Sequence, residues 1–397
     1  MKAIILSGGY GSRLRPLTLT RPKSIVEFCN VPIIEFQIAQ FSSISITDII
    51  IALNYKAEEL IPYLKRMEKK YGVSIHLSVE EKPLGTAGPI RLAKNFLTEN
   101  EPFFVCNSDI ICDFPLVEMI DMYNSKNMVD ECQGIILVKR VLDPSKYGVV
   151  IHCENTYLVD RFVEKPKQFI GDFINAGIYI LSSKIIDLIA PDVPVSIERE
   201  IFPLIASKKK LFCHRFYNEN HVWADIGNPR DYLIGSSLFL EFFNLNTNNS
   251  EKGFETELSK TNLRLFKELI DNNELKLLAK SNTFEVQGNN MIHKTVTIGV
   301  GCKIGPNVII GRNCVIGDGV RLKDCTIFGE TIIGNFSNIF GSIIGWNCKI
   351  GKWTRIEGLT VLGDEVSIRD ELQVISSIIL PNKSIESSIN TPNTICL

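Results

Sequence analysis

The chain has 397 residues, enough for two domains with buried cores, and its 45% hydrophobic and 22% charged residues are ordinary for a globular protein. A net charge of −2 gives no general attraction for nucleic acid or an anionic membrane, so we expect binding to neither. The eleven cysteines include no CxxC pair and the five histidines form no zinc-type motif, which indicates reduced thiols in a cytosolic protein without a zinc site.

The N-terminal segment turns glycine-rich after a short apolar run, so it is too short for a signal peptide. No stretch of the sequence approaches the roughly 18 apolar residues that span a bilayer. We therefore expect a cytoplasmic protein.

The first half of the chain alternates short β-rich runs with amphipathic segments. Strands are predicted at Lys2–Leu6, Asp48–Leu53, 103–106, 133–139, Gly148–His152 and 174–181, and helices over 32–41 and 58–70. This alternation predicts an α/β domain with a Rossmann-like, mixed, mostly parallel sheet and helices on both faces.

A further helix is predicted to begin at Asn228-Pro229, with Asn as N-cap and Pro at the first helical position, and to end near residue 243. Residues 244–260 are rich in Asn, Ser, Thr, Glu and Lys, which predicts a flexible linker or insertion; a solvated loop of no consequence is the alternative. We therefore divide the chain into a first domain of residues 1–243, a linker or insertion over 244–285 and a last domain of residues 286–397.

Aliphatic residues recur every six positions in the last domain. The spacing holds over Ile298, Ile304, Ile310, Ile316 and Leu322 and resumes, after a small slip, over Ile344, Ile350, Ile356 and Leu362, with glycine beside most of them. Such hexapeptide repeats are typical of a left-handed parallel β-helix. Each six residues form one side of a triangular coil with the aliphatic side chain inside, and we expect glycine to supply the tight corner.

A glycine-rich loop follows the first predicted strand, with the order Ser7-Gly8-Gly9-Tyr10-Gly11-Ser12-Arg13-Leu14-Arg15. Glycines let a backbone approach a phosphate, and arginines add charge-assisted hydrogen bonds to it. Lys23, further along, could reach the same anion. The loop is neither a Walker A motif nor a complete dinucleotide fingerprint. A tight turn is the alternative for the glycines alone, but the three cations favour a phosphate-binding loop.

This loop, followed by Arg21-Pro22-Lys23-Ser24, resembles the signature of the sugar-nucleotide pyrophosphorylases, nucleotidyltransferases that activate sugar 1-phosphates. The likeness continues at residues 80–89, 107–109 (Asn-Ser-Asp), 162–166 (Phe-Val-Glu-Lys-Pro), 175–177 (Asn-Ala-Gly) and 223–227 (Trp-Ala-Asp-Ile-Gly). It covers almost the whole chain except the Asn-rich segment. Ser12, Ser24 and Ala224 depart from the family's usual residues, but none of them removes a charged group.

The resemblance implies an in-line attack by a sugar phosphate on the α-phosphate of a nucleoside triphosphate, with Mg²⁺ as cofactor. Asp109 and Asp225 each follow or end an apolar run, where open α/β sheets place ligands, and the resemblance assigns both to the metal. A turn or helix cap is the alternative for a lone Asp at such a place. The resemblance makes the catalytic group Arg13, Lys23, Lys165, Asp109 and Asp225.

The resemblance also assigns the binding residues. Nucleotide binding falls to Leu6, Gly8, Gly9, Gly11, Ser12, Arg13, Lys23, Gly85, Thr86 and Asp109, with Asn54 as a further candidate near the base. Sugar-phosphate binding falls to Gly148, Glu164, Lys165, Asn175 and Gly177. We expect Trp223 and Trp346 to be packing residues.

Within the family the likeness is greatest to eukaryotic members that convert GTP and mannose 1-phosphate into GDP-mannose, and it is carried by residues 112–115, 144–150 and 343–346. Two alternatives stay open: the same reaction with another pair, such as glucose 1-phosphate with ATP, UTP or dTTP, or a non-catalytic regulatory relative. Because the loop glycines, Arg13, Lys23 and both aspartates are all present, the enzyme is favoured. The resemblance further implies a homo-oligomer and allows an alpha-type regulatory subunit as partner.

Overall fold

The computed structural model describes residues 1–53, 57–216, 222–248, 275–277 and 283–397. It forms two compact units, the first made of Met1–Gly9 and Gln37–Trp223, the second of Tyr10–Phe36 and Ala224–Leu397. The chain therefore leaves the first unit in the middle of the glycine-rich loop and returns to it at Gln37. The domain boundaries expected at residues 243 and 285 stay predictions.

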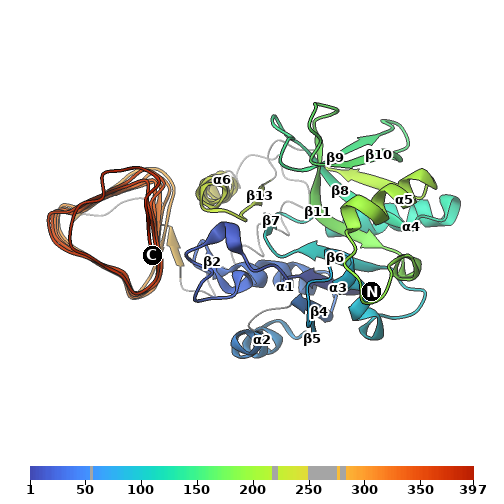
Figure 1. Ribbon diagram of the computed structural model, residues 1–397, viewed down its shortest axis with the longest axis horizontal. Helices are drawn as coiled ribbons and strands as arrows, with labels where there is room; N and C mark the ends of the chain where they lie inside the picture. The colour runs from blue at the N-terminus through green and yellow to red at the C-terminus, as the bar shows by residue number, and fades with distance from the viewer. Residues whose placement is uncertain (54–56, 217–221, 249–274, 278–282) are drawn as a thin grey trace. The chain divides into compact units, whose positions relative to one another are not determined.

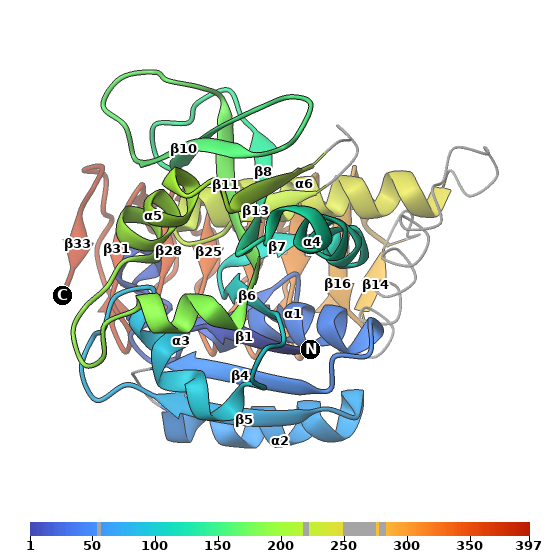
Figure 2. The ribbon, with the colours of Figure 1, turned by 90° about the vertical axis from the view of Figure 1, so that its right-hand side faces the viewer.

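The first unit is built on a nine-stranded mixed sheet, part of which faces the viewer in Figure 2. The strands β5, β4, β1 and β6 pair in parallel, and β11 joins them through antiparallel pairs with β6, β8 and β9. This is the predicted mixed α/β sheet. Its strands are β1 (Lys2–Leu6), β4 (Asp48–Leu53), β5 (Ser74–Val79), β6 (Phe103–Asn107), β8 (Gly134–Arg140), β9 (Gly148–His152), β10 (Val159–Glu164), β11 (Phe173–Leu181) and β12 (Leu211–Arg215).

Helices pack against this sheet at several strands. The helix α2 contacts β5, α3 contacts β4, α4 contacts β8 and β11, and α5 contacts β10 and β12. Their bounds are α2 (Ala57–Tyr71), α3 (Gly88–Leu92), α4 (Leu116–Asp130) and α5 (Phe202–Ser207), while α1 (Ile33–Ser43) begins in the second unit and continues in the first. The sequence predicted α1 and α2 within a few residues but missed α3, α4 and α5.

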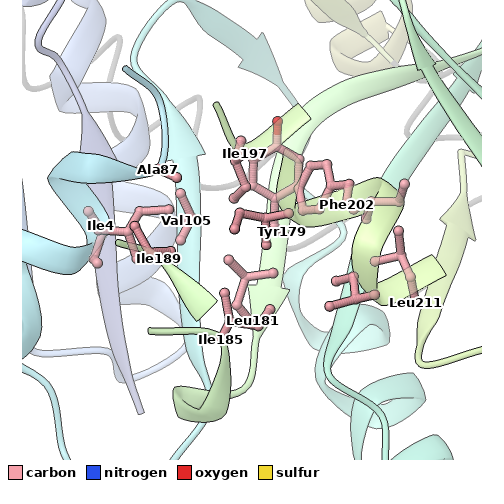
Figure 3. Packing of buried hydrophobic residues seen from close by; sticks show 14 of the residues in the cluster. Ile4, Ala87, Val105, Tyr179, Leu181, Ile185, Ile189, Ile197, Phe202 and Leu211 are labelled. Atoms are coloured by element: carbon pink, nitrogen blue, oxygen red, sulfur yellow. The ribbon is translucent and has the colours of Figure 1, made fainter. Parts of the chain in front are cut away.

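The core of the first unit centres on β11. Tyr179 is fully buried and meets the ring of Phe202 edge-on at 4.9 Å between centroids. Figure 3 shows Tyr179 with Ile197 and Phe202 beside it and Leu181 next along the same strand. A strand buried on both faces reads as a continuous apolar run, which is why 174–181 could be recognised.

The second unit contains the β-helix, seen as a stack of triangular coils in Figure 1. Its strands β15 to β32 form parallel ladders in three sheets, and the predicted parallel β-helix is confirmed. Residues 285, 303, 321, 338, 355 and 373 stand in one ladder, so successive coils contain 18, 18, 17, 17 and 18 residues. Each of the two 17-residue coils lacks one residue of the regular three times six, which explains the slip in the six-residue spacing. The left-handed sense of the coils stays a prediction.

The strands of the β-helix are short. Their bounds are β14 (Leu275–Leu277), β15 (Glu285–Val286), β16 (Asn290–His293), β17 (Thr297–Ile298), β18 (Lys303–Ile304), β19 (Val308–Ile310), β20 (Val315–Ile316), β21 (Arg321–Lys323), β22 (Cys325–Ile327), β23 (Ile332–Ile333), β24 (Asn338–Phe340), β25 (Ile343–Ile344), β26 (Lys349–Ile350), β27 (Arg355–Glu357), β28 (Val361–Leu362), β29 (Ser367–Ile368), β30 (Gln373–Ile375), β31 (Ile378–Ile379), β32 (Ser384–Ile385) and β33 (Ile395–Cys396). The inward aliphatic column is buried from Ile304 to Ile385, while Ile298 near its start is partly buried.

The role expected of the repeat glycines needs a correction. Gly299 and Gly317 do not have a positive φ; the left-handed residues stand two positions later, at Gly301 and Gly319 with φ of 73° and 65°. A Cβ on Gly317 would come within 2.8 Å of the Asn335 backbone nitrogen in the next coil. Glycine is therefore required there because neighbouring coils approach closely, not because the corner needs its conformation.

The second unit also contains a short hairpin of β2 (Glu27–Phe28) and β3 (Val31–Pro32), and the helix α6 (Pro229–Asn248). The backbone N–H of Asp231 donates to Asn228 Oδ1 at 3.0 Å, which confirms the predicted N-cap. The helix runs five residues beyond the predicted end at 243. Within the range expected to be linker, β14 pairs antiparallel with β16 and so extends one ladder of the β-helix.

None of the described helices combines the length and apolar character that crossing a membrane requires.

Candidate functional site

The predicted site residues divide between the two units. The first unit holds Leu6, Gly8, Gly9, Gly85, Thr86, Asp109, Gly148, Glu164, Lys165, Asn175 and Gly177, and the second holds Gly11, Ser12, Arg13, Lys23 and Asp225. Asn54 lies outside the described residues. Because Asp109 and Asp225 belong to different units, the hypothesis that they share one metal ion stays a prediction.

Asp109 stands in the tight connection between β6 and β7 (Ile110–Cys112). The buried side chain of Gln37 donates from Nε2 to two carbonyl oxygens of this connection, that of Asn107 at 2.9 Å and that of Ile110 at 3.2 Å. The connection is also bonded to β1, because Ser108 N donates to the Leu6 carbonyl at 3.1 Å. Gln37 therefore fixes the backbone on both sides of Asp109, a role that no pattern in the sequence indicates.

The loop with Gly85 and Thr86 is fastened to the segment around residue 195. Ala87 N donates to the Val195 carbonyl at 2.9 Å, and a Cβ on Gly85, which has a φ of 76°, would lie 2.4 Å from that same oxygen. The Thr86 hydroxyl donates to Glu198 Oε2 at 2.5 Å and accepts from Ile197 N at 2.9 Å. Glycine is thus obligatory at 85, and the Thr86 side chain has protein partners of its own.

Glu164 and Lys165 lie at the end of β10. Lys165 Nζ is 3.4 Å from Glu164 Oε1, and its side chain is 58% exposed, so the ammonium can still reach a ligand. Lys165 has a φ of 46° and its N–H donates to the Tyr147 carbonyl at 3.1 Å. Gly148 pairs with Glu164 across the sheet, and a Cβ there would lie 2.8 Å from Glu164 Oε2. The absence of a side chain at 148 therefore makes room for the carboxylate.

Asn175 and Gly177 lie where β11 departs from regular pairing with β8, between Asn175 and Tyr179. Asn175 Nδ2 donates to the Tyr179 hydroxyl at 2.9 Å, and Asn175 Oδ1 accepts from Gly177 N at 3.1 Å. Gly177 has a φ of 80°, a conformation that favours glycine. At this irregularity the Asn175 side chain bonds to two residues of its own strand, and these two bonds define its orientation.

Glu198 links the Thr86 loop to the sugar-phosphate candidates electrostatically. Burial raises the pKa of Glu164, Lys165 lowers it and Glu198 raises it further. Burial raises the pKa of Tyr179, and the Glu198 charge adds to that effect. The first unit therefore brings Thr86, Glu164, Asn175 and Tyr179 into one electrostatic environment, in which Glu198 is the member that sequence reasoning missed.

In the second unit, Gly11 and Lys23 lie together. Gly11 has a φ of 62°, and a Cβ there would come within 3.3 Å of Lys23 Cβ and 2.8 Å of Thr18 Cγ2. The Thr18 hydroxyl donates to the Gly11 carbonyl at 2.7 Å. The exposed residues Ser12 and Arg13 follow in a 3₁₀ turn (Ser12–Leu14), so Arg13 stands two residues after the glycine that packs against Lys23.

Asp225 ends β13 (Trp223–Asp225), and its Oδ1 accepts from Gly227 N at 2.9 Å. This is the local turn that a lone aspartate often makes. A carboxylate has a second oxygen and further lone pairs, so the turn is compatible with metal binding.

Trp223 and Trp346 are packing residues, as predicted. Trp223 is 7% exposed and donates from Nε1 to the Ala176 carbonyl at 3.0 Å, and Trp346 is 2% exposed. No disulfide joins any of the eleven cysteines, all of which lie among the described residues.

Comparisons with known proteins match both parts of the chain. Residues 2–241 match the family model described as nucleotidyl transferase, and residues 286–395 match the one described as the GMPPB C-terminal domain. The chain is 44% identical to the mannose-1-phosphate guanyltransferase of Schizosaccharomyces pombe, with 100% of both chains covered. It is 41% identical to the probable mannose-1-phosphate guanylyltransferase 2 of Oryza sativa subsp. japonica, again over 100% of both.

Two solved structures share the fold. A putative glucose-1-phosphate thymidylyltransferase from Bacillus anthracis has a TM-score of 0.53 at 23% identity, with 65% of this chain and 98% of that chain covered. A UDP-glucose pyrophosphorylase has a TM-score of 0.51 at 19% identity, with 60% and 98% covered. At these identities the likeness concerns the fold alone.

Proposed function

Because this chain belongs to the nucleotidyl transferase family, we propose that it transfers the guanylyl group of GTP to mannose 1-phosphate, giving GDP-mannose and pyrophosphate. The observation that carries the choice of substrates is the full-length likeness to mannose-1-phosphate guanylyltransferases. The first unit supports the reaction, because Glu198 bonds to Thr86 and its charge also acts on Glu164, beside Lys165.

A phosphate oxygen of mannose 1-phosphate forms the new bond to the α-phosphorus of GTP, and the bond to the leaving pyrophosphate breaks. The protein needs no nucleophile of its own, so its residues act by positioning and by neutralising charge. Lys165 binds the sugar phosphate and lowers its repulsion with the triphosphate. Glu164 accepts hydrogen bonds from sugar hydroxyls, and Asn175 completes the sugar pocket. Arg13 neutralises charge on the β- and γ-phosphates as the pyrophosphate leaves, and Lys23 does so from the side of the α-phosphate.

Mg²⁺ is the metal that this chemistry favours, with Asp109 and Asp225 as its candidate ligands. The described residues contain no group of three or more His, Cys, Asp or Glu side chains that could enclose a metal by themselves. This fits Mg²⁺, which is commonly held by one or two carboxylates together with substrate phosphates and water. When bound, the ion would neutralise charge on the triphosphate.

The test is pyrophosphate release by the purified chain with Mg²⁺, using GTP, ATP, UTP or dTTP against mannose 1-phosphate or glucose 1-phosphate. We expect the highest kcat/KM for GTP with mannose 1-phosphate. Asp109→Ala and Lys165→Ala should each lower kcat by about 100-fold or more, since each removes a group that stabilises transition-state charge. Lys167→Ala is the matched control, because Lys167 is exposed and two residues from Lys165.

Preference for another substrate pair would keep the reaction class and reject guanylyl and mannosyl specificity. No turnover with any pair would favour a regulatory subunit. Self-association, an alpha-type partner and a cytoplasmic location stay predictions.

A further inference from the structure

The segment Tyr10–Phe36 belongs to the same compact unit as the β-helix. It carries Gly11, Arg13 and Lys23, the candidates for triphosphate binding. Its turn hydrogen bonds, such as Leu14 N to the Gly11 carbonyl at 2.9 Å, join residues of the segment itself. Hydrogen bonds of this kind define the conformation of the segment. They do not fix its position on the rest of the second unit, which depends on contacts with residues outside the segment.

Side chains of the β-helix supply such contacts on both sides of Lys23. Arg21 Nε donates to Asp364 Oδ2 at 3.2 Å, and Trp346 Nε1 donates to Glu27 Oε2 at 3.2 Å. These two anchors stand two residues before Lys23 and four residues after it. A third lies further along, where Asn30 Nδ2 donates to the carbonyl oxygen of residue 310 at 2.8 Å.

The Arg21 side chain is held on two sides. Its guanidinium lies 4.1 Å from the centroid of the Trp346 ring, while its Nε bonds to Asp364. Trp346 in turn stacks on Phe328 at 4.0 Å between centroids, with 10° between the rings. A planar guanidinium held between an aromatic face and a carboxylate has little freedom to move.

The Asp364 side chain is 10% exposed and the Arg21 side chain 24%, so most of the Arg21–Asp364 pair is removed from water. Such a pair adds little to stability compared with apolar side chains of the same shape, because desolvation offsets the attraction. Its geometry is nevertheless specific, which makes a positioning role the better explanation for its presence.

Arg21 and Lys23 are separated only by Pro22, whose ring restricts the backbone between them. The position of Arg21 therefore limits where Lys23 can lie. Lys23 then begins a 3₁₀ turn, and a Cβ added to Gly11 would lie 3.3 Å from Lys23 Cβ, so the two residues are close neighbours. A shift of Arg21 therefore moves both the lysine and the glycine loop.

We infer that Asp364 and Trp346 are positioning residues for the nucleotide: by holding Arg21 they place Lys23 and the Gly11 loop against the triphosphate. This inference rests on the proposed function, since it assigns Lys23 and the loop to GTP. It makes the β-helix a part of the nucleotide site rather than only an appended domain.

The test compares Asp364→Asn, Arg21→Ala and the double variant in the full chain. We expect Asp364→Asn to lower kcat and weaken equilibrium GTP binding by about tenfold each, with the KM for mannose 1-phosphate changed less than about twofold. The double variant should be no worse than Arg21→Ala alone, because both changes break one interaction. Glu386→Gln is the matched control: it removes an exposed ion pair with Arg369, at 2.8 Å on the same β-helix, and should leave all values unchanged.

Thermal unfolding of each variant shows whether the chain is folded at the assay temperature. Wild-type kcat and GTP affinity in a folded Asp364→Asn variant would overturn the inference, as would additive losses in the double variant. If the wild type binds GTP but turns over no sugar, the proposed function fails and GTP affinity alone decides the inference. If the wild type does not bind GTP, both are rejected.

Discussion

The two units hold their candidate site residues in different ways. In the first, Glu164 and Gly148 face each other across two paired strands, and Asn175 is oriented by Tyr179 on its own strand. In the second, the segment around Lys23 is anchored by side chains such as Asp364, which is 343 residues away from its partner Arg21. A sheet fixes its residues through register, whereas a loop made of short turns needs distant side chains to fix it.

This difference gives different expectations for mutation. A change within the sheet should act near the altered residue, because its neighbours stay in register. A change in the β-helix should act on the nucleotide segment, which lies far away in sequence. The Tyr179 prediction below tests the first expectation. The Gly85 prediction concerns a loop of the same unit, and the Glu27 prediction concerns the contact between the nucleotide segment and the β-helix.

The largest effect is expected for Gly85→Ala. A non-glycine residue at φ of 76° costs about 1–2 kcal/mol, and the new Cβ would overlap the Val195 carbonyl oxygen, adding about 1–3 kcal/mol. We therefore expect a loss of about 2–5 kcal/mol in the free energy of unfolding, measured by urea denaturation, with weaker GTP binding.

Gly72→Ala is the matched control for that prediction. Gly72 has a similar φ of 66°, but an added Cβ would meet nothing within 4 Å. This variant should lose only the backbone contribution, about 1–2 kcal/mol. Equal losses at both positions would mean that the contact with Val195 does not fix the loop.

The sequence predicted the repeated and local features of the molecule well. The strands predicted at Asp48–Leu53 and Gly148–His152 begin and end at the same residues in the structure. Each is a mostly apolar run of the length that a buried strand needs. The β-helix was visible because every coil repeats the same aliphatic position. The role expected of repeat glycines was wrong at Gly299 and Gly317, although Gly305 does have a positive φ, since six-residue spacing does not show how closely neighbouring coils approach.

The supports of the site were the part that could not be predicted. Gln37, Glu198 and Asp364 are ordinary polar residues in the sequence, and their partners are distant along the chain. In a single sequence, the spacing of apolar residues indicates strands and helices. Nothing in it indicates which two distant side chains will come into contact after folding. Trp346 was correctly expected to pack, but its contacts with Arg21 and Glu27 were not foreseen.

A smaller effect is expected for Tyr179→Phe, which keeps the buried ring and removes only the hydroxyl. Asn175 Nδ2 then loses its acceptor, which should cost about 1 kcal/mol in the free energy of unfolding. Because the change frees the Asn175 side chain, the KM for mannose 1-phosphate should rise more than the KM for GTP. Steady-state kinetics with each substrate varied in turn measures this, and a larger effect on GTP would contradict the local action expected of the sheet.

The smallest effect, and the one that tests the other side of the comparison, is a pH dependence at Glu27. Burial raises the pKa of this carboxyl above its ordinary 4.5, Asp364 adds to the rise, and the hydrogen bond from Trp346 and the charges of Arg312 and Arg21 oppose it. A raised pKa in the folded protein contributes stability that is complete below pH 4.5 and is lost as the pH rises through the folded value.

Glu27→Gln keeps an oxygen for the Trp346 N–H and has no charge to bury. Its free energy of unfolding relative to wild type should therefore increase as the pH rises from 4 to 7. Urea denaturation at several pH values measures this, with Glu386→Gln, at an exposed site, as the control that should show no such trend. The activity of Glu27→Gln distinguishes the role of the hydrogen bond from that of the charge. If Glu27 acts through its hydrogen bond with Trp346, the variant should keep kcat near the wild-type value. A fall in kcat without a fall in stability would instead assign the charge of Glu27 itself to the placement of Lys23.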